Sequence, residues 1–81
     1  MKQSTPIQIL IADDHAVVRQ GLATIINHDS EMSVIAQAED GQQAIALYRQ
    51  HQPDITLMDL RMPRMGGVEA ITAICTEFKQ A

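Results

Sequence analysis

Three aspartates are the residues of this chain most suited to chemistry. Asp13 and Asp14 follow the apolar run 7–12 directly, and Asp59 follows the run 55–58. Two carboxylates about 4 Å apart repel each other by roughly 4 kcal/mol at an effective dielectric near 20. A cluster of all three would need protons or a cation, and hard oxygen ligands with open positions suit Mg²⁺. Asp59 could then act as a nucleophile toward phosphorus, because carboxylates form aspartyl phosphates.

Apolar runs and helical stripes alternate along the chain. Three short runs rich in β-branched residues are typical of buried parallel strands: 7–12, 32–38 and 55–58. Three further segments carry apolar residues at helical spacing: 17–26, 44–48 and 68–78. Asp14 can cap the first helix by accepting amides of its first turn. Pro53 is expected to end the second helix, because proline disfavours the helical region for the residue before it.

This alternation predicts an α/β domain with a parallel sheet and helical crossovers. If the second crossover reverses direction, the third strand lies beside the first and the strand order is 2-1-3. The reversal creates a topological switch point, and ligands bind there at the carboxyl ends of the strands. Those ends carry Asp13, Asp14 and Asp59, so fold and residue chemistry converge on one site.

Size and charge restrict the remaining possibilities. The 81 residues allow one small domain, and the net charge of −4 without a basic run argues against direct binding of nucleic acid or anionic membrane. A single cysteine excludes an internal disulfide. No stretch is long and apolar enough to span a bilayer, and the run after the N-terminus is too short for a signal peptide. We therefore expect a cytoplasmic protein.

Ordinary roles remain open for the same residues. Asp13 and Asp14 could be a helix cap plus a solvated acid, and Asp59 could be a turn former. His15 is expected to be a surface residue at the start of a helix, because Mg²⁺ disfavours imidazole. Arg61 and Arg64 could be solvated loop charges, although a nearby phosphoryl group could use either.

Three stretches together resemble the receiver domain of bacterial two-component response regulators. They are IADDH at 11–15, VRQGL at 18–22 and DLRMPRMGGVEAI at 59–71. The first two resemble the subgroup whose receivers precede a LuxR/NarL-type helix-turn-helix, and the resemblance runs from about Ile7 to the end of the chain. It implies a flavodoxin-like, three-layer α/β/α fold. It also implies control of a DNA-binding domain that this chain does not contain.

The resemblance assigns roles to the acidic residues. It implies that Asp59 accepts a phosphoryl group from the phosphohistidine of a sensor histidine kinase and also faces the metal. Asp14 would bind Mg²⁺ directly, Asp13 through water or at longer range, and the backbone carbonyl of Arg61 would be a further ligand. The residues implied to shape the loop are Met62, Pro63, Gly66 and Gly67, the glycines through conformations barred to other residues.

The chain also departs from the family pattern. Receivers continue through two more strands, in the order 2-1-3-4-5, with a Ser or Thr ending the fourth and a Lys ending the fifth. Lys79 cannot replace that lysine, because it falls at the end of the third helical segment. We therefore expect residues 1–81 to be the N-terminal part of a receiver domain, impaired in switching. The third strand would be an exposed sheet edge, and it or the first-helix face would favour self-association.

Two other functions compete with the phosphoacceptor. One is a small Mg²⁺-dependent aspartyl phosphatase of the haloacid dehalogenase type. Such enzymes carry a second acid two residues after the nucleophile, and Arg61 occupies that position here, so an enzyme is not expected. The other is an oligomerisation or interaction module that acts without phosphorylation through its open edge.

Overall fold

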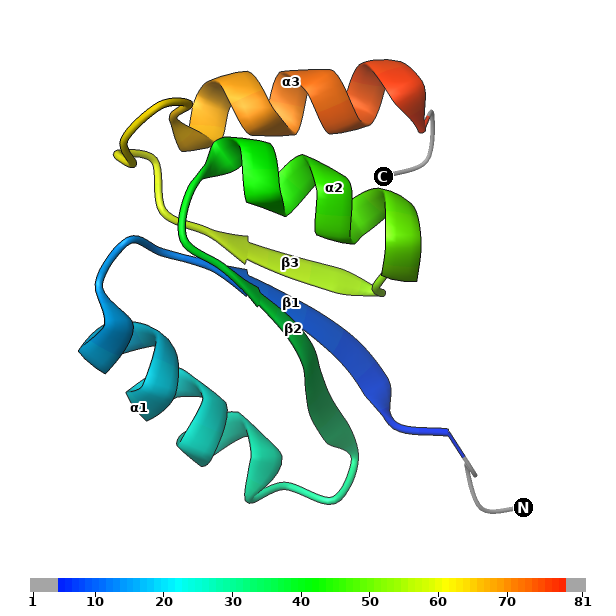
Figure 1. The fold of residues 1–81 in the computed structure, drawn as a ribbon. Coiled ribbons are helices and arrows are strands. Elements are labelled where there is room, and N and C mark those ends of the chain that lie inside the picture. The colour runs from blue at the N-terminus through cyan, green and yellow to red at the C-terminus, as the bar shows by residue number, and fades with distance from the viewer. Residues whose placement is uncertain (1–4, 79–81) are drawn as a thin grey trace.

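Strands and helices alternate in the order that the apolar runs predict (Figure 1). The computed structural model describes residues 5–78, so the prediction for Lys79 lies outside the described residues. All three predicted strands are confirmed with the same bounds. The elements are β1 (Ile7–Ala12), α1 (Ala16–Asn27), β2 (Met32–Ala38), α2 (Gly41–His51), β3 (Ile55–Met58) and α3 (Gly67–Glu77).

The strands form a parallel sheet in the order β2-β1-β3, which confirms the reversed second crossover. β1 is the central strand. On one side Ile9 pairs with Val34 and Leu10 with Ala36, so Ile35 is an extra residue at a bulge in β2. On the other side the register with β3 is regular from Ile9 to Ala12.

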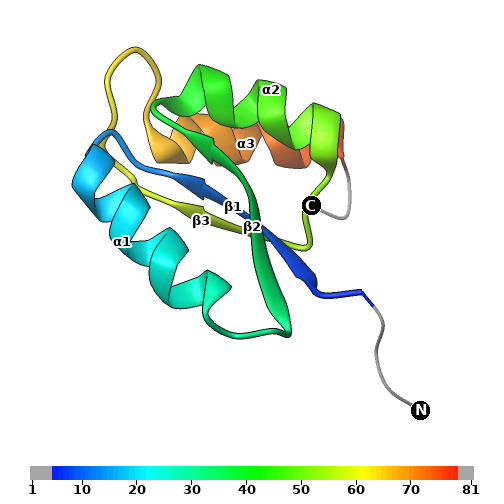
Figure 2. The ribbon, with the colours of Figure 1, turned by 60° about the horizontal axis from the view of Figure 1, so that its bottom comes forward.

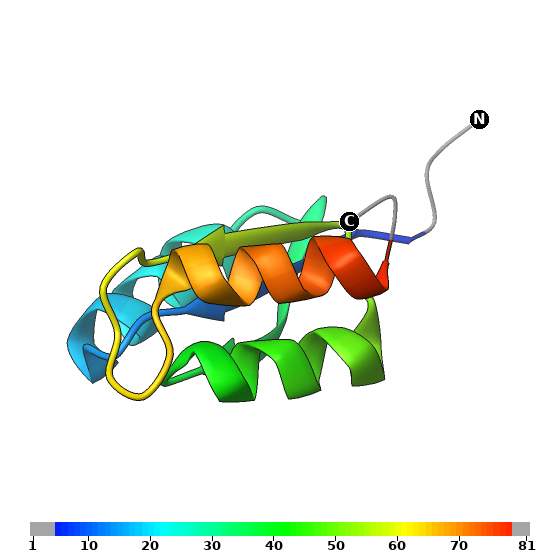
Figure 3. The same cartoon turned by 90° about the horizontal axis from the view of Figure 1, so that it is seen from above.

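Helices cover the two faces of the sheet unequally. α1 lies on one face, and α2 and α3 lie side by side on the other (Figures 2 and 3). Because side chains alternate along a strand, Ile9 and Ile11 of β1 pack toward α1, whereas Leu10 packs toward α2. Leu10 and Ile11 are the largest fully buried side chains among residues 5–78. The rings of Tyr48 and Phe78 meet with centroids 5.1 Å apart.

β3 is an open edge, as the sequence predicts. Within residues 5–78 it pairs only with β1. Ile55 and Leu57, on the α1 side of the sheet, remain 43% and 39% exposed, because α1 packs mainly over β1 and β2. In the part of the chain that the structure describes, no helix is long and apolar enough to cross a membrane.

α2 ends as the sequence predicts. Gln52, which precedes Pro53, leaves the helix in the left-handed conformation with φ 44°, and its N–H donates to the Tyr48 carbonyl oxygen. Asp54 then joins β3 to the sheet, because its N–H donates to the Gln8 carbonyl oxygen and its carboxylate accepts the Gln8 N–H, both at 2.8 Å.

Candidate functional site

The backbone hydrogen bonds of the sheet continue one residue beyond the ends of β1 and β3, to Asp13 and Asp59. The N–H of Asp59 donates to the carbonyl oxygen of Ala12 at 2.9 Å, and the N–H of Asp13 donates to that of Ala38 at 3.0 Å. The last rungs of the sheet therefore fix both residues at its carboxyl edge, where a parallel α/β sheet binds ligands.

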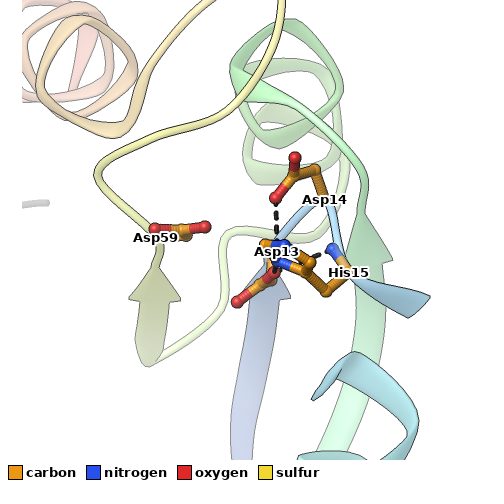
Figure 4. A group of neighbouring side chains, drawn as sticks. All are labelled: Asp13, Asp14, His15 and Asp59. Atoms are coloured by element: carbon orange, nitrogen blue, oxygen red, sulfur yellow. Dashed lines mark hydrogen bonds and ion pairs between the residues drawn. The ribbon is translucent and has the colours of Figure 1, made fainter. Parts of the chain in front are cut away.

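The structure brings Asp13, Asp14 and Asp59 together, as predicted, and adds His15. One ligand atom from each of the four residues lies within 4.8 Å of the others. Figure 4 shows Asp59 at the tip of β3, with Asp13 and Asp14 leading from β1 into the next loop. Asp13 and Asp59 are partly buried, whereas Asp14 and His15 are exposed. A divalent cation would thus meet oxygen ligands on a surface open to solvent.

His15 contacts two of the aspartates, whereas the sequence predicts only a surface residue at the start of a helix. Its Nδ1 lies 2.8 Å from an oxygen of Asp13 and 3.0 Å from one of Asp14 (Figure 4). Its backbone N–H also donates to the Asp13 carboxylate at 2.8 Å. The signal was present in the sequence, since a histidine directly after two aspartates at a strand end cannot lie far from them.

The predicted cap of the first helix by Asp14 is wrong. Within the described residues, His15 is the N-cap of α1, and the helix has no side-chain cap hydrogen bond. The backbone of His15 is extended, at φ −98° and ψ 109°, and its N–H is bound to Asp13. The carboxylates of Asp13 and Asp14 therefore do not cap α1.

Electrostatics couples the imidazole to the acids. The hydrogen bond to Asp13, and then the charges of Asp14 and Asp13, raise the pKa of His15 above its ordinary 6.5. Burial alone would raise the pKa of Asp13, but hydrogen bonds from His15 and the charges of His15 and Arg19 hold it below the ordinary 3.8. Arg19 also donates from Nη1 to the Asp13 carbonyl oxygen at 2.6 Å, which ties α1 to this loop.

The loop between β3 and α3 folds back onto the phosphoacceptor candidate. The carboxylate of Asp59 accepts the N–H of Arg61 at 3.1 Å, and the N–H of Gly67 donates to the Leu60 carbonyl oxygen at 3.1 Å. A Cβ at Gly67 would lie 2.8 Å from the Cα of Leu60 and closer still to the Asp59 carbonyl oxygen. Gly67 is thus needed for close approach.

The sequence predicts that the loop glycines adopt backbone conformations barred to other residues, and this prediction is wrong. All four glycines lie within the described residues and none has a positive φ. The left-handed residue of the loop is Arg64, at φ 65°. Its guanidinium contacts the carboxylate of Asp40, with Nε 2.7 Å from Oδ2, so it is not a free loop charge.

The donor set fits Mg²⁺. Three carboxylates supply hard oxygen ligands, and the partly exposed position leaves room for the waters that this ion retains. A cavity of about 340 Å³ is lined by Asp13 and Asp59 together with apolar residues that include Ile11, Leu22 and Leu57. Two of the three aspartates therefore line an open cavity next to the acidic cluster.

Comparisons with known proteins agree with this geometry. The model of the family described as response regulator receiver domain matches residues 9–81. The transcriptional regulatory protein YdfI of Bacillus subtilis (strain 168) is 48% identical over 67 residues, which are 83% of this chain and 32% of YdfI.

Solved structures match as well. A two-component response regulator of the LuxR family from Aurantimonas sp. SI85-9A1 gives a TM-score of 0.89 at 38% identity, over 95% of this chain and 55% of that chain. A chain of the CheX–CheY–BeF3–Mg²⁺ complex from Borrelia burgdorferi gives 0.84 at 32% identity, over 95% and 58%. These matches confirm the flavodoxin-like class and the LuxR/NarL resemblance. The chain spans about a third of YdfI and little more than half of the solved chains.

Proposed function

This chain belongs to the response regulator receiver domain family, and we propose that it takes a phosphoryl group from a sensor histidine kinase onto Asp59. The observation that supports this is the meeting of Asp13, Asp14 and Asp59 at the carboxyl edge of the sheet, where one oxygen of each lies within 4.8 Å of the others. An isolated turn-forming aspartate would not need two further acids beside it.

The transfer exchanges one bond for another. A carboxylate oxygen of Asp59 forms the new O–P bond as the P–N bond of the phosphohistidine breaks, and the electron pair of that bond returns to the imidazole nitrogen of the kinase. Asp14 would hold Mg²⁺ directly, with Asp13, Asp59 and the backbone carbonyl of Arg61 completing the protein side. When bound, the ion offsets the negative charge of the carboxylates and of the phosphoryl oxygens. The Borrelia burgdorferi complex, which contains Mg²⁺, supports the choice of ion.

The relatives support a wider role for this receiver. YdfI is a transcriptional regulatory protein, and we propose that this receiver controls a DNA-binding domain outside the present sequence, in the cytoplasm. The acidic net charge of −4 argues that the segment itself does not bind nucleic acid. A phosphatase activity has no supporting observation, since the residue two positions after Asp59 is Arg61, whose N–H is bound back to Asp59.

Titration of Mg²⁺ into the 81-residue chain tests the site. Asp59→Asn and Asp14→Ala should each weaken Mg²⁺ affinity by about tenfold or more, the loss seen even for residues that only support metal ligands. Asp29→Asn is the matched control, because Asp29 lies in the turn after α1, outside the acidic cluster, and its carboxylate accepts the N–H of Glu31 at 2.8 Å. Unchanged affinity in both site variants would contradict the proposal.

Acetyl phosphate offers a second test. We expect the intact mass of the chain to rise by one phosphoryl group, with the modified peptide containing Asp59. The Asp59→Asn chain should remain unmodified under the same conditions. Modification that persists in this variant would place the phosphoacceptor elsewhere.

A second candidate function is self-association without phosphorylation. The observation that favours it is the open outer edge of β3 together with the exposed side chains of Ile55 and Leu57. Unpaired strand edges present backbone groups to a second chain. Light scattering should then show a dimer or larger species whose population is the same with and without Mg²⁺ and acetyl phosphate.

A further inference from the structure

Asp40 is a buried acid that the metal site does not contain. It lies at the start of α2 with only 2% of its surface exposed. One carboxylate oxygen accepts the N–H of Gln43 at 2.8 Å and caps the helix. The other oxygen, Oδ2, takes no part in the cap. A buried carboxylate needs a hydrogen-bond partner for each oxygen.

That partner is Arg64, which comes from the loop between β3 and α3. Its Nε and Nη2 both donate to Oδ2 of Asp40. The backbone of Arg64 is left-handed, with φ 65°, a conformation that residues other than glycine mostly avoid. The ion pair therefore accompanies a backbone conformation that arginine rarely adopts.

A second contact fixes the loop at the neighbouring residues. The N–H of Gly41 donates to the carbonyl oxygen of Met65 at 2.9 Å. A Cβ at Gly41 would lie 2.8 Å from the Cβ of Met65, so α2 and the loop are in direct contact there. Figure 1 shows this loop running from the tip of β3 to α3 past the start of α2.

The far end of the same loop carries the chemistry. Asp59 begins it, and the Arg61 N–H is bound to the Asp59 carboxylate. Only Met62 and Pro63 separate Arg61 from Arg64, and proline restricts the backbone of its own residue and of the one before it. Only a short segment with a restricted backbone therefore lies between Arg64 and Arg61.

We propose that the Asp40–Arg64 ion pair is a positioning device that holds the Asp59 carboxylate and the Arg61 carbonyl in place for the cation. Asp40 and Arg64 are positioning residues, since neither belongs to the acidic cluster. The part of this inference that concerns the cation rests on the proposed function. The part that concerns the order of the loop does not.

Asp40→Asn separates the two tasks of this side chain. Asparagine is as good a helix cap as aspartate, so the Gln43 contact survives while the charge that binds Arg64 is removed. Arg64→Gly removes the guanidinium and suits the left-handed backbone. Arg64→Lys retains the charge without the two-pronged geometry, and should restore part of what Arg64→Gly loses.

The matched control is Arg49→Gln. Arg49 forms an ion pair with Glu77, with Nε 2.8 Å from Oε1, and its side chain is 57% exposed compared with 58% for Arg64. This pair joins α2 to α3 without contacting the loop 59–66. A general effect of losing a half-exposed arginine would therefore appear in Arg49→Gln as well as in the Arg64 variants.

Two quantities are measured on the 81-residue chain well below its thermal transition. Amide exchange in the loop 59–66 should become faster in Asp40→Asn and Arg64→Gly, with α1 unaffected. Mg²⁺ affinity should fall by about tenfold in each, as for other residues that support metal ligands. The double variant should be no worse than either single one, because both remove the same interaction.

The outcomes separate this inference from the proposed function. If the original chain binds no Mg²⁺, the proposed function fails and loop exchange alone decides whether the ion pair positions the loop. If Mg²⁺ binds but both quantities in Asp40→Asn equal those in Arg49→Gln, the inference is overturned. Faster exchange with unchanged affinity would also overturn it, since the pair would then stabilise the fold without positioning the site.

Discussion

At residue 67 the backbone passes so close to Asp59 that only a hydrogen fits in place of a side chain. Gly67→Ala should therefore lower the free energy of unfolding by about 1–3 kcal/mol, the usual cost of overpacking. Gly21 provides the control, because a Cβ there meets nothing within 4 Å. Gly21→Ala should raise the free energy of unfolding by about 0.5–1 kcal/mol, since alanine is the better helix former. Urea titration measures both, and equal effects would contradict the close approach.

His15 should titrate above its ordinary range. Its pKa is raised above 6.5 by the carboxylates of Asp13 and Asp14, so the protonated imidazole stabilises the folded state. This contribution is fully present below pH 6.5 and is lost as the pH rises through the folded-state pKa. Proton NMR of the imidazole ring measures that pKa, and Asp13→Asn should bring it back toward 6.5. A value at or below 6.5 in the unaltered chain would contradict the geometry.

Single residues differ in how far the sequence reveals them. The meeting of Asp13, Asp14 and Asp59 was predictable, because strand ends and topology place them without knowledge of any side-chain contact. The Asp40–Arg64 pair was not predictable. Its residues are 24 positions apart in the chain, and Arg64 lies in a loop whose sequence has no periodicity. Arg64 combines this contact with a left-handed backbone, whereas residue type alone would have favoured the neighbouring glycines for that conformation.

Among the elements, strands were the most predictable. β1 follows Pro6 and stops at Asp13, and β3 is enclosed between Asp54 and Asp59, so polar residues mark their bounds in the sequence itself. The start of α1 was less predictable, because an N-cap is decided by local hydrogen bonds. The Asp13 carboxylate accepts the His15 N–H, and this contact replaced the expected cap by Asp14.

The start of α2 should be sensitive to acid. The hydrogen bond from Gln43, and then that from Arg64, lower the pKa of Asp40 below its ordinary 3.8. Ionised Asp40 therefore stabilises the fold above about pH 3.8, and this contribution is lost as the pH falls through the folded-state pKa. Asp40→Asn should lower the free energy of unfolding by on the order of 1–3 kcal/mol at pH 7. In this variant the free energy of unfolding should also fall less steeply as the pH is lowered into the acid range. Chemical denaturation at pH 7 and pH 3 measures this, and identical pH profiles for the two chains would contradict it.

The part of the chain that the structure describes is a thin slab with extents of 41 × 31 × 16 Å, and within it one sheet face carries only α1 (Figures 2 and 3). We expect it to self-associate at the β3 edge. Ile55→Lys should shift sedimentation toward the monomer, because a charge on an edge strand opposes pairing. Val68→Lys is the control, since Val68 is 62% exposed but lies on α3, beyond the opposite face of the sheet. A monomer in the unaltered chain at micromolar concentration, or an equal effect of both variants, would contradict this prediction.

The central position of β1 has a consequence for the order of events in folding. β2 reaches β1 through the single helix α1, whereas β3 must close a longer loop, as the contact of Gln8 with Asp54, 46 positions away, illustrates. Because closing a longer loop costs more entropy and slows pairing, we expect β1, α1 and β2 to assemble first. Asp13 and Asp14 belong to that early unit, while Asp59 arrives with β3. In a stopped-flow refolding experiment, the capacity to bind a divalent cation should therefore appear last, as a signal that the chain has completed its fold.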